Sequence, residues 1–331
     1  MLTGLNPLNG TVCGQVHGLT VQVSSPHSEI RNRVAEFLKP LLRGEDGGPY
    51  AAVDFTLALL DKNRIPAEPA GSKTLIQFAN VSCFRNGDHF SFHAKDGSFI
   101  EANVQARRGW GFVSKELTGS KWYILADLLM APLMEMLKQR GFCGLHAAAL
   151  SNDGKGYLFP GDAESGKTSI ALSLIKRGFR YLADDKVLLT QENGELVALA
   201  FTRRFNIDPE ISRWYPELSC LEKLEPLPFT VKRPIDVSEI YPDSFVSSCS
   251  PRFLIYLQRT EDFESRIVPL APQESFKRLV RQTIYSFERD VVMRQIRLLG
   301  QLVKTTKGYL LYHGRDLFGD PERLLELLSC L

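Results

Sequence analysis

The chain has 331 residues, of which 44% are apolar and 24% are charged, so it is globular in composition and long enough for two domains. Forty basic against 38 acidic residues leave a net charge of +2 without a polybasic segment, which argues against a nucleic-acid interface or binding to an anionic membrane. The six cysteines are scattered without metal-ligand spacing, so reduced thiols and a cytoplasmic location are expected. The opening MLTGLNPLNG lacks signal-peptide features, and the most apolar segment, 124–136, is too short and polar to span a bilayer.

Residues 1–120 are expected to form an N-terminal α+β accessory or recognition domain. Apolar periodicity indicates strands at 19–23 and 52–60, a helix at 28–42, and a hairpin of 89–93 with 99–104. His89 and His93, with Cys83 nearby, have no further ligand at a suitable spacing, so we expect a surface strand rather than a metal site.

Residues 121–331 are expected to form a second, α/β domain. Helical periodicity covers 122–140, where Pro132 predicts a kink or a break. Further helices are predicted at 274–285 and 288–304. The predicted strands of this domain are 144–150, 157–159, 179–183, 187–189, 196–201, 253–258, 266–268 and 309–312.

A phosphate-binding (Walker A) pattern, G-x-x-x-x-G-K-[ST], lies between the strand at 157–159 and a helix that stops at Gly178. The predicted nucleotide-binding residues are Gly161, Asp162, Ala163, Glu164, Ser165, Gly166, Lys167, Thr168 and Ser169. Backbone N–H groups at such a helix start surround a phosphate, the lysine adds a positive charge, and the Thr168 hydroxyl can hold Mg²⁺. A chance glycine-rich turn is the weaker interpretation, because strand, loop and helix agree.

Two carboxylates, Asp184 and Asp185, end the next predicted strand, and Asp184 lies seventeen residues after Lys167. Parallel strands joined by one helix have their carboxyl ends at the same edge, so both side chains are expected to face the loop. One could bind Mg²⁺ and the other could take a proton from an attacking hydroxyl. The alternative is a solvated strand end or a helix-capping pair.

Residues 144–187 resemble the catalytic core of the HPr kinase/phosphorylase family and its HPr-kinase-like relatives, whose fold is related to phosphoenolpyruvate carboxykinase. The similarity covers about 45 of the 331 residues. It rests on His146, fifteen residues before the loop glycine, on the loop, on a helix ending Lys176-Arg177-Gly178, and on Ala183-Asp184-Asp185.

The resemblance implies a phosphate-loop core of that type and an ATP-dependent kinase, using ATP or another nucleoside phosphate donor with Mg²⁺. Lys167 would contact phosphates, Thr168 would serve the metal, Asp184 would act as the base, and His146 would lie beside the active site. We also expect the second carboxylate, Asp185, to hold Mg²⁺ together with Thr168. A lone histidine in an apolar strand can also be an ordinary core residue. The implied acceptor is a serine-type hydroxyl on a small protein, peptide or amino acid, and hexameric relatives imply a possible homo-oligomer.

Two departures from the family pattern narrow this prediction. The family loop follows the pattern G-x-S-G-x-G-K, whereas this chain has Ala163-Glu164-Ser165 at the middle positions. Glu164 places a negative charge beside a phosphate site. The arginine-rich C-terminal segment of the bifunctional enzymes is missing, which argues against phosphorylase activity and against HPr as the substrate.

Four basic residues after the predicted core are candidate substrate or phosphate contacts, with solvated turns as the alternative: Arg203, Arg204, Lys232 and Arg233. The sequence therefore predicts a kinase acting on a hydroxyl. The alternative is a nucleotide-binding switch or recognition protein with little or no transfer. A carboxykinase is disfavoured, because the motifs of an oxaloacetate site are missing.

Overall fold

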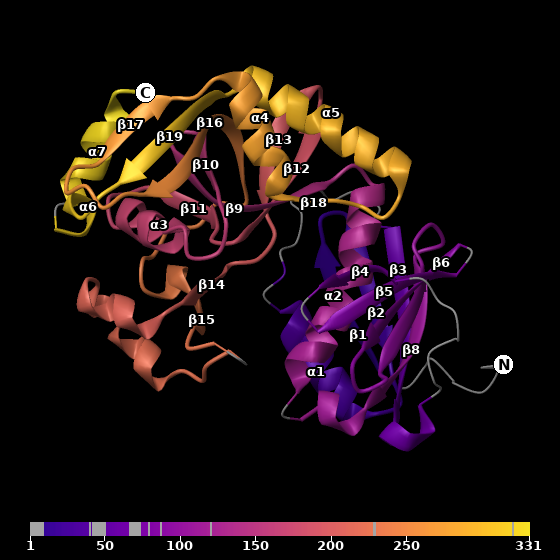
Figure 1. Ribbon diagram of the computed structural model, residues 1–331. Helices are drawn as coiled ribbons and strands as arrows, with labels where there is room; N and C mark the ends of the chain where they lie inside the picture. The colour runs from indigo at the N-terminus through magenta and orange to yellow at the C-terminus, as the bar shows by residue number, and fades with distance from the viewer. Residues whose placement is uncertain are drawn as a thin grey trace. The chain divides into compact units, whose positions relative to one another are not determined.

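The computed structural model describes residues 10–39, 41, 51–65, 74–78, 80–86, 88–119, 121–227, 230–319 and 321–331. The chain divides into two compact units, Met1–Arg140 and Gly141–Leu331 (Figure 1). Both combine helices with sheets, which confirms a mixed α/β protein. None of the described helices is long and apolar enough to cross a membrane.

The first unit is an eight-stranded sheet in the order β1-β2-β3-β8-β7-β6-β5-β4. Strand β3 is parallel to both of its neighbours, and the other pairs are antiparallel. Helix α1 packs against β1 and β2, and α2 packs against β5, β6 and β7. The elements are β1 Thr11–Val16, β2 Leu19–Ser24, α1 Ser28–Leu38, β3 Ala51–Leu60, η1 Lys62–Arg64, β4 Thr74–Phe78, β5 Val81–Asn86, β6 His89–Ala94, β7 Phe99–Asn103, β8 Arg108–Ser114, η2 Lys115–Leu117 and α2 Trp122–Gln139.

The strands and the hairpin predicted for this unit agree with β2, β3, β6 and β7. The helix predicted for 28–42 ends at Leu38, and residues 40 and 42 lie outside the described residues. Helix α2 continues through Pro132, and its contacts with the first sheet place the division after Arg140 rather than between residues 120 and 121. His93 is buried and stacks on Phe99, so the strand that carries it is not a plain surface strand.

The second unit is built on a nine-stranded sheet in which β9 and β16 are long strands that change partners along their length. The pairings β9–β12–β13–β16–β10–β9 close a ring. Strand β10 runs parallel to β16, and β16 runs parallel to β19, so their carboxyl ends share one edge. The strands are β9 Cys143–Asn152, β10 Lys155–Pro160, β11 Arg180–Ala183, β12 Lys186–Glu192, β13 Glu195–Ala200, β16 Ser248–Arg259, β17 Arg266–Pro269, β18 Thr283–Ile284 and β19 Lys307–His313.

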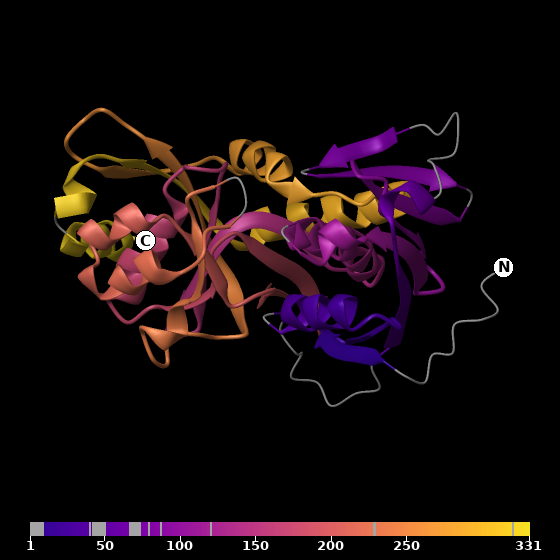
Figure 2. The ribbon, with the colours of Figure 1, turned by 90° about the horizontal axis from the view of Figure 1, so that it is seen from below.

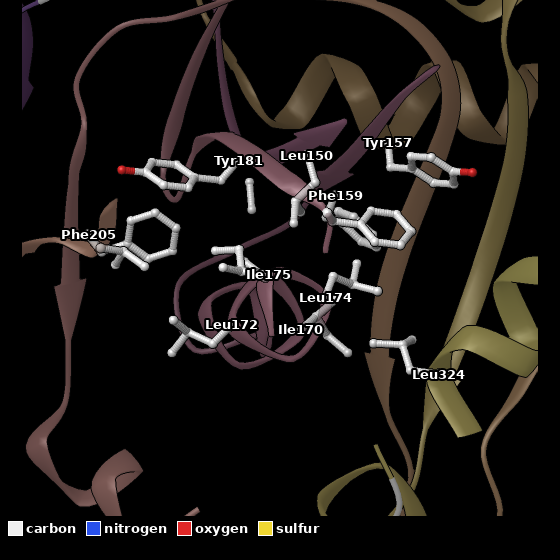
Figure 3. Close-up of a cluster of buried hydrophobic side chains, with 14 of the residues drawn as sticks. Leu150, Tyr157, Phe159, Ile170, Leu172, Leu174, Ile175, Tyr181, Phe205 and Leu324 are labelled. Atoms are coloured by element: carbon white, nitrogen blue, oxygen red, sulfur yellow. The ribbon is translucent and has the colours of Figure 1, made fainter. Parts of the chain in front are cut away.

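Helix α3, Lys167–Ile175, is the centre of this unit's core. All of its apolar side chains are buried, because strands cover one side while α7, Pro321–Ser329, and the segment 201–245 lie around it (Figure 3). Figure 3 shows Tyr181 beside Phe205, whose ring centroids are 4.9 Å apart in an edge-on contact. The core therefore fixes the helix that follows the glycine-rich loop.

The segment 201–245 is a small subdomain that the sequence did not predict. It contains a two-stranded sheet and short 3-10 helices, which lie beside α3 and α7 in Figure 2. Its elements are β14 Arg204–Ile207, η3 Pro209–Arg213, η4 Pro216–Lys223, β15 Arg233–Asp236 and η5 Val237–Glu239.

The predicted helix 274–285 is too long. Helix α4, Pro272–Arg281, stops before β18, in which Thr283 and Ile284 pair with Leu145 and Gly144 of β9. Ile284 continues the helical spacing, but pairing with β9 satisfies the backbone of these β-branched residues instead. The remaining helices are α5, Arg289–Thr305, and α6, Asp316–Gly319.

Candidate active site

Strand β9 pairs with a different strand on each edge before and after His146 and Ala147, and the site forms at this level. On one edge β10 ends with Pro160 opposite Ala147, and β18 continues the pairing from Leu145. The Gly161 N–H donates a hydrogen bond of 3.4 Å to the His146 carbonyl, so the glycine-rich loop leaves the sheet at this level.

The other edge of β9 changes partner at the same level. Strand β11 ends at Ala183, and β12 begins with Lys186 opposite His146. The Ala147 N–H donates 3.0 Å to the Asp185 carbonyl, which fixes the backbone of the Asp184-Asp185 pair. Strands β10 and β11 are both antiparallel to β9 and therefore parallel to each other, with β9 between them. The loop and the carboxylates consequently leave the sheet on either side of His146.

The loop turns sharply into α3. Gly166 has φ of +97°, a left-handed conformation that glycine adopts easily, and the exposed Glu164 has φ of +63°. Glu164 therefore holds a left-handed conformation that is strained for a residue with a side chain.

Lys167 folds back into the loop and is 6% exposed. Its ammonium donates to the carbonyls of Gly161 at 2.8 Å and Asp162 at 2.7 Å. Burial lowers the pKa of Lys167, while Asp185 and Asp184 oppose that shift. A buried ammonium held inside a loop of backbone amides is suited to an anion.

Asp184 is 4% exposed and accepts two hydrogen bonds. The Thr168 hydroxyl donates to Oδ1 at 2.8 Å, and the Asn206 N–H donates to Oδ2 at 3.2 Å. Burial raises the pKa of Asp184 to about 6, although both hydrogen bonds act in the opposite direction. The sequence around Asn206 did not predict β14, so this contact with Asp184 was not expected.

Asp185 lies next to a different partner. Its Oδ1 is 2.6 Å from His146 Nε2, and its side chain is 45% exposed. Burial alone would raise the pKa of Asp185, but the hydrogen bond and charge of His146 lower it below the ordinary value. The adjacent carboxylates thus differ in pKa: Asp184 is buried with a raised pKa, and Asp185 is paired with His146 with a lowered pKa.

Both carboxylates and the loop line one cleft of about 480 Å³. Residues of the subdomain form its other side: Asn206, Asp208, Ile211, Leu227, Thr230 and Lys232. Of the four basic candidates, only Lys232 is among the described residues that line it. The other three lie elsewhere. Arg203 lies over the Phe245 ring, and the Arg233 side chain donates to the Val231 carbonyl. Arg204 lies opposite Asp236 in the backbone register of β14 and β15.

Two further contacts hold the loop from outside. His313, at the end of β19, donates from Nε2 to the Ser165 carbonyl at 3.1 Å. Gln282, just before β18, donates to Asp162 Oδ1 at 2.9 Å. Both are single polar residues far along the chain, and neither carried a pattern that predicts its position.

No cluster of three or more His, Cys, Asp or Glu side chains that could hold a metal ion exists among the described residues. Mg²⁺ needs fewer, because it is commonly bound by one or two carboxylates together with substrate phosphates and water. The oxygens of Thr168, Asp184 and Asp185 at the cleft are the hard donors that this ion prefers, so the residues fit Mg²⁺.

Comparisons with known proteins do not assign the chain to a family. No family model matches, and no curated protein matches. Among solved structures, the Hpr(Ser) kinase/phosphatase from Coxiella burnetii matches 49% of this chain and 93% of that chain, with 19% identity and a TM-score of 0.27. A similarity of this size establishes neither a fold nor an activity for this chain.

Proposed function

We propose that the protein transfers the γ-phosphoryl group of ATP, or of another nucleoside triphosphate, to the hydroxyl of an acceptor. The observation that carries the proposal is the meeting of Lys167 and Thr168, from the start of α3, with Asp184 and Asp185, from the end of β11, in one cleft. Phosphoryl transfer requires positioning and charge neutralisation more than covalent catalysis, and these residue types supply both.

Binding of the donor is assigned to the loop. The N–H groups of the loop and the first turn of α3 would surround the β- and γ-phosphates, with the Lys167 ammonium between them. Lys232 lines the same cleft and is close enough to Lys167 and Asp184 to influence their pKa values, so it is a second cation for the transferred group.

Thr168 and Asp185 would hold Mg²⁺, which neutralises phosphate charge when it is bound. The ionised state of Asp185 suits a metal ligand.

Asp184 is assigned as the proton acceptor, because its raised pKa of about 6 is near the pH at which a general base is effective. The acceptor oxygen forms a bond to the γ-phosphorus as its proton passes to Asp184. The bond from that phosphorus to the β–γ bridging oxygen breaks, and its electron pair leaves with ADP. The products are a phosphate monoester and ADP.

The test is ADP release from Mg-ATP in the presence of hydroxyl acceptors, which include serine, serine-containing peptides and small proteins. Wild type should release ADP with at least one acceptor. Lys167→Ala should lose ATP binding, and Asp184→Asn should bind ATP without transfer. If wild type binds Mg-ATP tightly but releases no ADP with any acceptor, the chain is a nucleotide-dependent switch. If Lys167→Ala keeps its ATP affinity, the loop does not hold the phosphates.

A further inference from the structure

Four strands of the second unit have their carboxyl ends at the same edge of its sheet. Strand β10 is parallel to β16, β16 is parallel to β19, and β11 is parallel to β10 across β9 (Figure 1). The order along this edge is therefore β11, β9, β10, β16 and β19. The carboxylates follow β11 and the glycine-rich loop follows β10, so the ends of β16 and β19 lie on the side of the loop away from the carboxylates. In α/β sheets, ligands commonly bind outside the carboxyl ends of parallel strands.

A cleft of about 610 Å³ lies at the ends of β16 and β19. The described residues that line it are those at which the two strands end: Arg259, Thr260, Glu261, His313, Gly314 and Arg315. The His313 imidazole, which donates to the Ser165 carbonyl, joins this cleft to the loop. The volume is within the range of about 300–1,000 Å³ that is typical of small-molecule sites.

The charged side chains of this cleft are open to a ligand. Arg259, Glu261 and Arg315 are exposed, and none of the three has an ion-pair partner within the described parts of the chain. A guanidinium group is weakly hydrated and stacks on planar rings, while a carboxylate accepts hydrogen bonds from hydroxyl groups. Two guanidinium groups and one carboxylate together suit a ligand with a flat ring and hydroxyl groups better than they suit a simple anion.

Hydrogen bonds between the two strand ends hold the cleft in shape. The Thr260 N–H donates to the His313 carbonyl at 3.2 Å, and the Gly314 N–H donates to the Ser265 hydroxyl at 2.7 Å. A side chain at position 314 would clash with the Phe263 carbonyl oxygen, so glycine allows the segment after β16 to approach the end of β19 closely. The cleft is thus a preformed feature of the fold, which reduces the cost of ordering it on binding.

In-line transfer determines the side of the loop on which the nucleoside lies. The attacking oxygen and the leaving oxygen are on opposite sides of the γ-phosphorus. With the acceptor hydroxyl beside Asp184 at the end of β11, the ADP group extends from the loop toward the ends of β16 and β19. Neighbouring strands are about 4.8 Å apart, so these ends lie about 5 and 10 Å from the end of β10. A nucleotide whose phosphates occupy the loop can reach that far.

We propose that the cleft at the ends of β16 and β19 holds the nucleoside of the donor. The base stacks on the guanidinium groups of Arg259 and Arg315, and a ribose hydroxyl donates to the Glu261 carboxylate. The inference rests on the proposed function, because it takes the phosphates to lie in the Gly161–Thr168 loop and Asp184 to be the base. It makes the donor a nucleotide rather than an inorganic polyphosphate.

Two other cavities near the loop are less suitable for the nucleoside. The apolar pocket that Ser169 and Leu324 line has a volume of only about 90 Å³, which is below the range typical of small-molecule sites. The cleft of about 480 Å³ contains both carboxylates, so the proposed reaction requires it for the acceptor.

The experiment compares Mg-ATP with Mg-tripolyphosphate, which carries the phosphates without the nucleoside, by calorimetric titration of the full chain. Wild type should bind Mg-ATP more tightly. The double variant Arg259→Lys/Arg315→Lys keeps both positive charges but loses both planar groups. It should weaken Mg-ATP binding by about two- to 30-fold, the range of a cation–π contact, and leave tripolyphosphate binding unchanged. Arg252→Lys, at the opposite end of β16, is the matched control and should change neither affinity.

Glu261→Ala separates a nucleoside contact from simple electrostatics. If the cleft only attracts anions, removal of this negative charge should tighten the binding of both ligands. Loss of the hydrogen bond from the ribose should instead weaken Mg-ATP binding by about tenfold, while tripolyphosphate binding stays unchanged or becomes tighter.

Three results would overturn the nucleoside assignment while the phosphate loop stands, which loss of Mg-ATP binding in Lys167→Ala would show. The first is a ratio of ATP to tripolyphosphate affinity that stays within twofold of wild type in both the double lysine variant and Glu261→Ala. The second is the absence of any preference for Mg-ATP in wild type. The third is tighter binding of both ligands by Glu261→Ala. Failure of wild type to bind either ligand would instead contradict the proposed function, and the nucleoside site with it.

Discussion

The Thr168 hydroxyl donates a 2.8 Å hydrogen bond to Asp184 Oδ1, which joins the first turn of α3 to the end of β11. This bond links the helix that would carry the phosphates to the carboxylate that would take the acceptor's proton. Because Asp184 is buried, the fold rather than solvent fixes the position of both groups. The proposed roles of the two carboxylates follow from their different surroundings.

Asp184→Asn and Asp185→Asn should separate these roles. Removing the base should lower kcat by about 10²–10⁴-fold with nucleotide affinity preserved. Removing the ionised Asp185 should instead raise the Mg²⁺ concentration needed for half-maximal activity. Steady-state kinetics under Mg²⁺ titration measures both. If the Mg²⁺ requirement rises in Asp184→Asn and not in Asp185→Asn, the two roles are exchanged.

The pH dependence of kcat/KM should show the raised pKa of Asp184. Its carboxylate accepts a proton only when ionised, so activity should increase about tenfold per pH unit below pH 6 and level off above about pH 7. The profile from pH 5 to 8 measures this directly. A flat profile in that range would contradict Asp184 as the base.

Asp184 should also reduce the stability of the second unit at neutral pH. Its pKa of about 6 in the folded chain exceeds the ordinary 3.8, so its favourable contribution is complete below pH 3.8 and is lost as the pH rises through 6. The full difference is on the order of 3 kcal/mol. The Tm of Asp184→Asn relative to wild type should therefore increase between pH 4 and pH 8. A difference in Tm that does not change with pH would show that Asp184 is not protonated in the folded chain near pH 5.

Glu164→Gly should relieve backbone strain in the loop and remove a negative charge from it. The left-handed φ of +63° costs a side chain about 1 kcal/mol, and the glutamate adds negative charge at the phosphate cleft. Glu164→Gln removes only the charge, so it should tighten Mg-ATP binding a few-fold at low salt. Glu164→Gly should do the same and also have a higher Tm than Glu164→Gln. Weaker ATP binding in both variants would mean that Glu164 assists the ligand.

His146→Ala should act through Asp185. Without the 2.6 Å contact, the pKa of Asp185 should rise and its value as a metal ligand should fall, with a loss of about 10–100-fold in apparent Mg²⁺ affinity. His146→Gln, which keeps a hydrogen-bond donor, should recover part of that loss. A change in kcat without a change in Mg²⁺ requirement would place His146 at the acceptor instead.

The features that the sequence predicted well are local. Lys167 and Thr168 follow each other in a loop with its own strand and helix, and the Asp184-Asp185 pair follows one helix later. The parallel relation of β10 and β11 was also expected, although β9 between them was not. These four residues meet in one cleft because short segments of the chain connect the loop, the helix and the following strand.

The contacts that the sequence did not predict come from long-range pairing. Asn206, Gln282 and His313 reach the site through β14, β18 and β19. Each is a lone polar residue without periodicity, and its place depends on which strand edge its segment finds. The same cause explains the helix prediction that continued to residue 285, since pairing with β9 overrides helical spacing there.

The stoichiometry of the reaction tests the central claim most directly. Mass spectrometry of the acceptor, together with ADP measured in the same reaction, should give one phosphate monoester for each ADP in wild type and neither product in Asp184→Asn. ADP without a phosphorylated acceptor would indicate nucleotide hydrolysis. That result, or tight ATP binding without ADP, would contradict a hydroxyl-directed kinase.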